Sequence, residues 1–209
     1  MKRKLLLLLM CAALLLTSCA QQPATDDRPA MYIEPAQLTV QEELIKSIAS
    51  QGRNCNIYDF QLGKEQLGIT VSVYRLENKQ WQLYTGGSQL HLPAQEGKGR
   101  FALNFGPLTE GILTSMLDEK NNVMTLRQAP TDILYDVTGL NVTTSQLSAL
   151  AEVSYGEEIP LMLQFISSQL PEDNSNAVIT IQPEELAALG HEHVFFVTAV
   201  FSPMSSNHE

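Results

Sequence analysis

The sequence predicts a mainly β fold, an antiparallel β-sandwich of about nine short strands with one N-terminal helix and one short C-terminal helix. Several stretches alternate apolar and polar residues, and they recur at a spacing of roughly 8–12 residues. Helical periodicity, in contrast, is confined to two stretches, one near each end of the chain. No repeat or shift in composition divides the chain after residue 30, which indicates one domain.

Two stretches alternate most clearly, Leu67–Tyr74 and Arg100–Phe105. A period of two predicts a strand with one buried face. The side chains expected to point inward are Leu67, Ile69, Val71 and Val73 in the first strand and Phe101, Leu103 and Phe105 in the second. A turn at Glu77-Asn78-Lys79 predicts that the first strand forms a hairpin with the next.

Further strands follow from weaker patterns and from the turns between them. They are expected at Asn56–Leu62, Gln80–Thr85, Ser88–Leu92, Gly111–Leu117, Val123–Arg127, Leu147–Ser154, Ile159–Ile166 and Val194–Phe201. The last of these is apolar at nearly every position, which is typical of a strand covered on both faces. The turn 155–158 predicts a hairpin between the two strands beside it, and the polar run after Gly139 suggests a loop. Two small β-subdomains meeting near Pro130 are the alternative architecture.

The N-terminal helix is expected at Val40–Ser50. Thr39 and Glu42 form a capping box, in which each side chain satisfies the backbone N–H of the other residue. The apolar side chains expected to pack on the following strands are Leu44, Ile45 and Ile48. A short helix is expected at Pro183–Leu186, because proline favours the first helical turn and acidic residues favour the positive end of the helix dipole.

The N-terminus, Met1–Cys19, has the form of an export signal. Three basic residues precede the apolar run Leu5–Leu16, which is shorter than the about 20 residues that span a bilayer. The run ends in Leu16-Thr17-Ser18-Cys19, which closely resembles the lipobox of bacterial lipoproteins. The resemblance implies that the Cys19 thiol receives a diacylglycerol and that the chain is cut just before it.

These features divide the chain into four segments. Residues 1–18 are the expected lipoprotein signal peptide, and residues 19–30 are the lipidated Cys19 followed by a polar, proline-containing tether. Residues 31–205 are expected to form the single β-sandwich domain, and residues 206–209 a disordered tail. The implied location is the extracytoplasmic face of the cell membrane.

Charge and cysteine content narrow the classes of partner. The signal contains three of the 13 basic residues and no acidic ones, so the mature chain has 10 against 23 and a net charge of −13. This balance argues against nucleic acid and against electrostatic docking on anionic lipid. Cys55 is the one cysteine left after processing and lipidation, so no intrachain disulfide is expected. A small buried residue is the favoured interpretation of Cys55, and a reactive thiol is the alternative.

No nucleophile, zinc-protease, phosphate-loop or dinucleotide motif occurs, so we expect no cofactor and no enzymatic activity. His191 and His193 are a weak candidate metal pair, because on one strand they would share a face. The third ligand would have to come from Glu184, Glu185 or His91, and we expect exposed histidines without metal. Two acidic pairs, Glu157 with Glu158 and Asp132 with Asp136, are expected to be solvated rather than catalytic.

Aromatic residues give a possible ligand surface. The alternation predicts that Tyr74 and Tyr84 face outward as cross-strand neighbours, where they would form a small aromatic patch. It places Trp81 and Phe105 in the core. The patch is the candidate surface for stacking a sugar ring.

By overall texture, residues 40–201 resemble β-rich lipoproteins of Gram-positive gut bacteria. The stretches that carry the resemblance are Val73-Tyr74-Arg75-Leu76 followed by Lys79-Gln80-Trp81, and Tyr155-Gly156-Glu157-Glu158-Ile159-Pro160-Leu161. The resemblance implies no activity. The expected function is a binding or structural module anchored to the membrane through Cys19, with its protein or glycan partner open. A ligand-binding lipoprotein for a sugar or peptide, accessory to a transporter or sensor, is the alternative, and a hydrolase has the least support.

Overall fold

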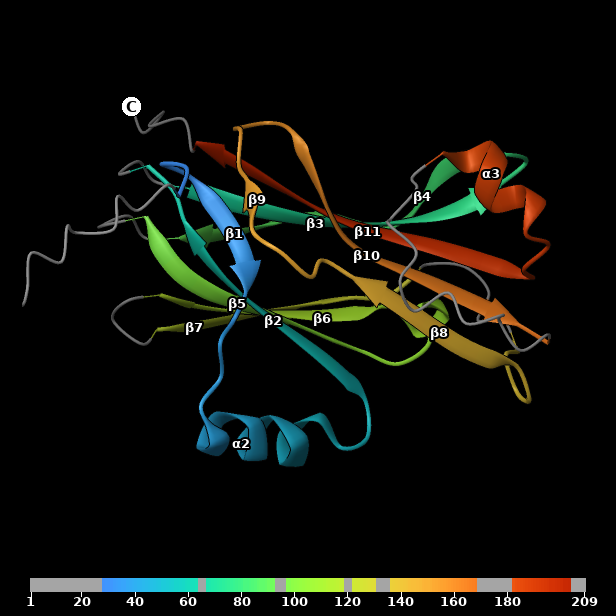
Figure 1. Cartoon of the computed structure of the whole chain (residues 1–209), viewed down its shortest axis with the longest axis horizontal. Helices are drawn as coiled ribbons and strands as arrows, with labels where there is room; N and C mark the ends of the chain where they lie inside the picture. Colours follow the sequence, from blue (N-terminus) through green and yellow to red (C-terminus); the bar gives the residue numbers. More distant parts are fainter. Residues whose placement is uncertain are drawn as a thin grey trace, which may run out of the picture.

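The computed structural model describes residues 28–63, 67–92, 97–118, 122–130, 136–168 and 182–203. The predicted signal peptide, Cys19 and the tail at 206–209 lie outside these residues, as does Asp132. The described residues contain 11 strands in two antiparallel sheets, which pack face to face as a β-sandwich (Figure 1). The predicted fold class is therefore confirmed.

Within the described residues, six strands form the first sheet and five form the second. The first sheet has the order β7 (Val123–Gln128), β6 (Ile112–Asp118), β5 (Lys98–Phe105), β2 (Asn54–Gln61), β1 (Tyr32–Pro35) and β9 (Ala151–Glu152). The second sheet has the order β4 (Gln80–Leu92), β3 (Leu67–Glu77), β11 (His193–Pro203), β10 (Glu158–Ser167) and β8 (Asn141–Gln146). Three pairs of neighbouring strands, β3–β4, β5–β6 and β6–β7, follow each other directly in the chain, whereas the remaining pairings join strands that are separated by a helix or by other strands.

The inner faces of the two sheets form one continuous apolar core. The alternating residues predicted to point inward are buried wherever their side chains are described, namely Ile69, Val71, Val73, Phe101, Leu103 and Phe105. Tyr58 on β2 crosses the layer, and its hydroxyl donates a hydrogen bond to the backbone oxygen of Leu161 on β10 at 3.2 Å. Period-two alternation therefore predicted burial correctly in these strands.

β11 lies at the centre of the second sheet and is covered on both faces, as its apolar sequence predicts. Its residues Phe195 and Val197 face the core between the sheets. On the outer face, Val194 and Phe196 form a second apolar cluster with Leu186 of helix α3 (Pro183–Ala188). α3 therefore confirms the predicted short helix and covers part of the outer face (Figure 1).

β4 differs from the prediction in two ways. It runs without a break through Gly86 and Gly87, where two separate strands were expected. Its pairing with β3 also shifts register twice, between Thr70 and Ser72 and between Val73 and Tyr74. A bulge of this kind puts an extra residue in one strand and reverses the side-chain alternation beyond it.

The strand that pairs with β10 also differs from the prediction. The expected strand Leu147–Ser154 is reduced to the two residues of β9, and its hairpin with the next strand is wrong, because β10 pairs instead with the polar stretch Asn141–Gln146. The backbone N–H of Leu147 still donates to Leu161 O at 2.8 Å, after which the chain crosses to the first sheet and forms β9. β8 is an edge strand, and an edge tolerates the polar side chains that suggested a loop.

Candidate functional site

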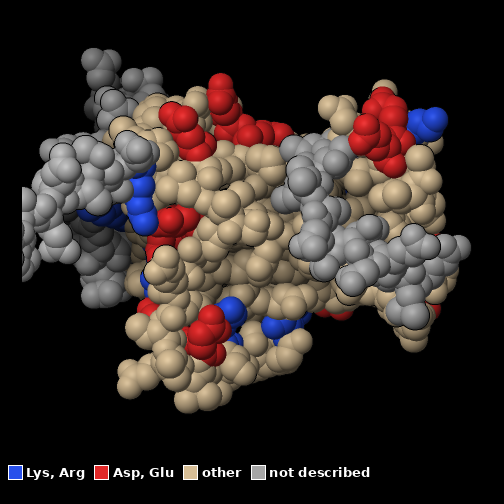
Figure 2. Space-filling model, in the orientation of Figure 1, with Lys and Arg blue, Asp and Glu red and all other residues tan. Residues whose placement is uncertain are grey.

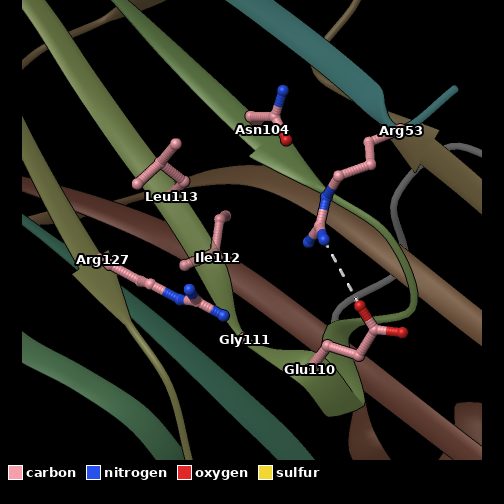
Figure 3. A pocket seen from close by; sticks show the side chains of 7 residues that line it. All are labelled: Arg53, Asn104, Glu110, Gly111, Ile112, Leu113 and Arg127. Carbon is pink, nitrogen blue, oxygen red and sulfur yellow. Dashed lines mark hydrogen bonds and ion pairs between the residues drawn. The ribbon is translucent and has the colours of Figure 1, made fainter. Parts of the chain in front are cut away.

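A pocket of about 180 Å³ opens at one end of the first sheet (Figure 3). Three of its residues, Asn104, Leu113 and Arg127, stand side by side on β5, β6 and β7. The neighbouring row, in which Phe105, Ile112 and Gln128 pair across the same strands, is buried in the core. Because side chains alternate along a strand, Asn104, Leu113 and Arg127 point to the outer face of the sheet.

The remaining wall of the pocket comes from two loops. Arg53 lies after Gln51 and Gly52, the two residues that follow the N-terminal helix. Glu110 is the last residue of the short 3-10 segment η1 (Leu108–Glu110), and Gly111 is the residue after it. Gly111 has φ 85°, and a Cβ there would collide with the carbonyl group of Gln128. The close passage of this loop over β7 therefore requires glycine.

Gln164 fixes the loop from the core side. Its side chain is fully buried, and its amide oxygen accepts a hydrogen bond from the backbone N–H of Leu108 at 2.6 Å. Its amide nitrogen donates to the backbone oxygen of Gly106 at 3.1 Å. One polar side chain of the second sheet thus satisfies two backbone groups of the loop that carries Glu110.

The charges in the pocket are positive on balance. Arg53 forms an ion pair with Glu110 at 3.4 Å, and both side chains are largely exposed. Arg127 forms no hydrogen bond or ion pair with any other residue in the described part of the chain. The two guanidinium groups extend toward the space between them, with Ile112 and Gly111 in between (Figure 3). The arrangement offers forked N–H donors above an apolar floor, which suits a carboxylate or another small anion.

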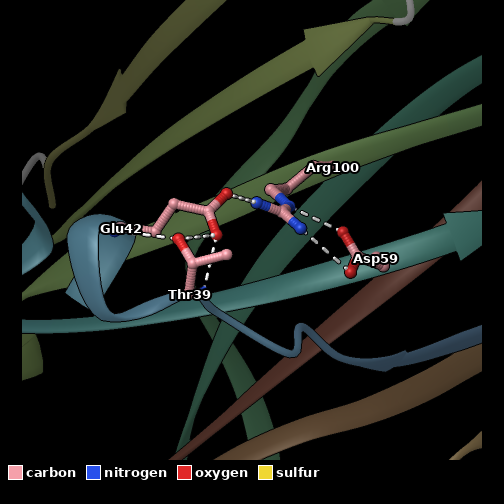
Figure 4. Close-up of polar contacts among 4 residues, drawn as sticks. All are labelled: Thr39, Glu42, Asp59 and Arg100. Carbon is pink, nitrogen blue, oxygen red and sulfur yellow. Dashed lines mark hydrogen bonds and ion pairs between the residues drawn. The ribbon is translucent and has the colours of Figure 1, made fainter.

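A second polar cluster joins helix α2 (Val40–Ser50) to the same sheet face (Figure 4). Arg100 donates to both carboxylate oxygens of Asp59, at 2.6 and 3.2 Å, and to Glu42 at 2.8 Å. Glu42 also accepts from the backbone N–H and the hydroxyl of Thr39, and the predicted capping box is confirmed. The Thr39 N–H, the Thr39 hydroxyl and Arg100 together lower the pKa of Glu42 to about 2.

The orientation of α2 is the reverse of the expected one. Glu42, Lys46 and Ser50 are the less exposed residues of the helix and share one side, which lies toward the sheet. The apolar side chains that were expected to pack on the strands are instead exposed, at 62% for Leu44, 64% for Ile45 and 69% for Ile48. We call these three residues and Val40, which is 88% exposed, the apolar face of α2.

The structure separates the two tyrosines of the predicted ligand surface. Tyr74 lies on the outer face of the second sheet beside Phe196, and its hydroxyl hydrogen-bonds to Glu158. Tyr84 packs on the core residue Phe195 at 5.2 Å between ring centroids and donates to Thr109 O. The expectation that both face outward is therefore wrong for Tyr84, because the extra residue in β4 turns its side chain inward.

Trp81 is also misplaced by the alternation. It lies outside the core between the sheets and packs on Phe196 at 5.3 Å, in the same outer cluster as Tyr74. Phe105, in contrast, is buried in the core as predicted. The outer face of the second sheet therefore carries aromatic side chains, but α3 and Phe196 already pack against them.

The two histidines of the candidate metal pair do not share a face. His191 precedes β11 and packs on Phe165 at 4.9 Å, whereas His193 begins the strand and lies 6.4 Å from Phe195. Burial lowers the pKa of both imidazoles. The described residues contain no group of three or more His, Cys, Asp or Glu side chains arranged to hold a metal ion. The condition that a single strand run through both histidines is therefore not met.

Three further residues considered in the sequence analysis, Cys55, Asp136 and Glu158, lie in separate parts of the structure. Cys55 is half-buried on the outer face of β2, and burial raises the pKa of its thiol. Asp136 accepts a hydrogen bond from the backbone N–H of Thr138 at 3.0 Å, which together with the Thr138 hydroxyl lowers the pKa of its carboxyl. The carboxylate of Glu158 accepts a hydrogen bond from the hydroxyl of Tyr74.

Fold and site together define a class, an antiparallel β-sandwich with a small cationic pocket and an outward-facing amphipathic helix on one sheet. Comparison with known proteins adds no narrower identity: no protein-family model, curated protein or solved structure matches the chain. The lipoprotein resemblance stays a prediction from the sequence. Within the described residues, neither helix has the length and apolar character needed to cross a bilayer.

Proposed function

We propose that this chain is a lipid-anchored protein of the extracytoplasmic membrane face whose β-sandwich binds a small carboxylate ligand in the pocket between Arg53 and Arg127. The anchor is supported by the Leu16-Thr17-Ser18-Cys19 sequence at the end of a short apolar run. The pocket favours ligand binding over a purely structural role.

The observation that carries the proposal is the guanidinium of Arg127, which has no partner among the residues that the structure describes. In a chain with a net charge of −10, acidic partners are plentiful, yet Arg127 forms no ion pair with another described residue. It stands beside Arg53 at a concave surface, and Glu110 neutralises only one of the two guanidinium charges there. A carboxylate would accept from both forks, and Leu113 would contact its apolar part.

The pocket volume limits the ligand to a small molecule or to one residue of a chain. About 180 Å³ accommodates a carboxylate with one short apolar side chain. N-acetylleucine is therefore a suitable probe, and N-acetylleucinamide is its matched uncharged counterpart. The free C-terminus of a short peptide has the same chemistry, which agrees with the peptide-binding alternative predicted from the sequence.

The test is a binding titration, followed by NMR, of both probes against the full chain purified from membranes. We expect the acid to bind at least tenfold more tightly than the amide, because a charge-assisted pair contributes about 1.5–3 kcal/mol. Arg127→Gln should remove the preference, whereas Lys79→Gln, which deletes an equal charge in the β3–β4 turn, should keep it. Equal affinity for acid and amide would refute a carboxylate site, and binding of inorganic phosphate alone would assign the pocket to another anion.

The anchor is tested separately by intact mass. Protein extracted from membranes should begin at Cys19 and carry the added mass of its acyl chains, and Cys19→Ser should lose them. An unmodified mature mass in the wild type would refute the anchor and leave the pocket untouched.

A further inference from the structure

We propose that the apolar face of α2 docks on the lipid bilayer, at the boundary between headgroups and acyl chains. This inference rests on the lipid anchor of the proposed function and adds a second, non-covalent contact to it. The site is the row Val40, Leu44, Ile45 and Ile48, and the partner is the lipid surface itself.

The first support is the orientation of the helix. A surface helix of a globular protein normally turns its apolar side to the core. α2 does the opposite, because Glu42 is held by Arg100 and the polar side of the helix lies on the sheet. Its four apolar residues, spaced i, i+4, i+5 and i+8, form one exposed face. Such a face on a folded domain indicates an interaction surface.

The second support is the point at which the chain enters the domain. Arg28, the first described residue, donates to Glu34 on β1 at 2.7 Å. Glu34 pairs in register with Asp59, and Asp59 binds Arg100, which binds Glu42 of α2. These residues form one row on the outer face of the first sheet, because Ile33 beside Glu34 is buried in the core. The chain thus enters on the sheet face that carries α2.

The distance to the anchor is short. Eight residues lie between Cys19 and Arg28, and the nine Cα-to-Cα steps of a fully extended chain span about 30 Å. The sheet face that carries α2 is therefore never far from the membrane once Cys19 is lipidated. Tethering of this kind gives a second, weak contact a high effective concentration, so a few apolar side chains are enough to bind.

The size of the apolar face favours lipid over a protein partner. Figure 2 shows acidic patches over the β9–β10 turn and over α3, whereas acidic and basic side chains lie together at the lower end of the molecule, where α2 contributes Glu42, Glu43 and Lys46. The apolar face offers on the order of 400 Å², below the roughly 600–800 Å² that each partner buries in a stable protein interface. A bilayer needs no complementary shape, and an interfacial helix binds in proportion to its apolar area.

The experiment places a fluorescent reporter on the helix. Full-length protein with Trp81→Phe and Ile45→Trp is purified from membranes and reconstituted into phosphatidylcholine vesicles with or without brominated acyl chains, which quench nearby tryptophan. The matched control is Trp81→Phe with Leu83→Trp, because Leu83 is 60% exposed on the second sheet against 64% for Ile45. We expect brominated lipid to reduce the emission at position 45 about twofold or more and to leave position 83 unchanged.

The outcomes separate the docking from the anchor. Protein that sediments with the vesicles but shows equal quenching at positions 45 and 83 refutes the docking and leaves the anchor standing. Quenching at position 45 that persists with Cys19→Ser supports docking and shows that docking does not depend on the anchor, whose presence is decided by intact mass. A covalent dimer from Ile48→Cys with Cys55→Ser upon oxidation, without quenching at position 45, would show that a second copy covers the face and would overturn the proposal. Leu44→Trp serves as a second reporter on the same face.

Discussion

Gln164 offers the sharpest test of how the core holds the pocket loop. Replacement by leucine keeps the size of the side chain and removes both hydrogen bonds to the loop. The N–H of Leu108, whose residue is fully buried, would lose its partner at 2.6 Å, at a cost of about 1–3 kcal/mol. The Gly106 oxygen is partly buried, and the loss of its bond at 3.1 Å adds about 1 kcal/mol.

The expected decrease in the free energy of unfolding is therefore about 2–4 kcal/mol for Gln164→Leu. In a domain of this size, 1 kcal/mol corresponds to about 2–4 °C, so Tm should fall by roughly 5–15 °C. Urea denaturation measures the free energy, and Gln146→Leu, at an exposed position of β8, is the control that should change it by less than about 0.5 kcal/mol. A decrease below about 1 kcal/mol in Gln164→Leu would refute the idea that this side chain holds the loop.

Three further tests address other parts of the fold. Because the folded-state pKa of Glu42 is lowered to about 2 from 4.5, its carboxylate stabilises the start of α2 above pH 4.5 and loses this effect as pH falls toward 2. Amide-exchange protection of α2 should fall across that window, and Glu42→Gln should abolish the dependence. Gly111→Ala should lower the free energy of unfolding by at least about 1–2 kcal/mol more than Gly156→Ala, measured in urea. Both glycines have positive φ, but only at Gly111 would a Cβ meet the backbone. The Cys55 thiol, whose pKa is raised by burial, should react with a disulfide reagent at pH 8 more slowly than a free cysteine, and urea should remove the difference; equal rates before urea would contradict the burial.

Much of the β-sandwich was predictable because burial in a strand is a local pattern. In β5, Phe101 and Phe105 alternate with polar or small residues, and nothing in the tertiary structure overrides that order. The strands that were missed, β1 and β8, are short or polar, and their pairing depends on neighbours distant in the sequence. Edge strands need little apolar pattern, because solvent covers one side of them.

Which face of the second sheet carries Tyr84 and Trp81 depends on the register between β3 and β4, and this register cannot be read from the sequence. Two shifts in the β3–β4 pairing reverse which side chains face the core, although each strand alone alternates regularly. Gly86 and Gly87 signal an irregularity in β4, but they fit a bulge and a chain break equally well.

The pocket was not predictable from spacing. Arg53 follows a helix, Arg127 lies on an edge strand, and Glu110 belongs to a loop, so only the folded sheet brings them together. One weak signal was present: Arg127 is the last residue of the predicted strand Val123–Arg127, in a chain poor in basic residues. A lone arginine at such a position usually protects a sheet edge, so the signal has no specificity for a ligand.

The existence of helix α2 was predictable from the sequence, but its orientation on the sheet was not. The capping box and the apolar spacing correctly predicted a helix at Val40–Ser50, because both act within the helix itself. The pattern states that one side is apolar and does not state what covers that side. The outer face of the first sheet presents Asp59 and Arg100, and an ion pair at 2.8 Å with Glu42 turns the polar side of the helix inward. The apolar face is then left for a partner outside the fold, and a lipid surface at the end of an eight-residue tether would lie within its reach.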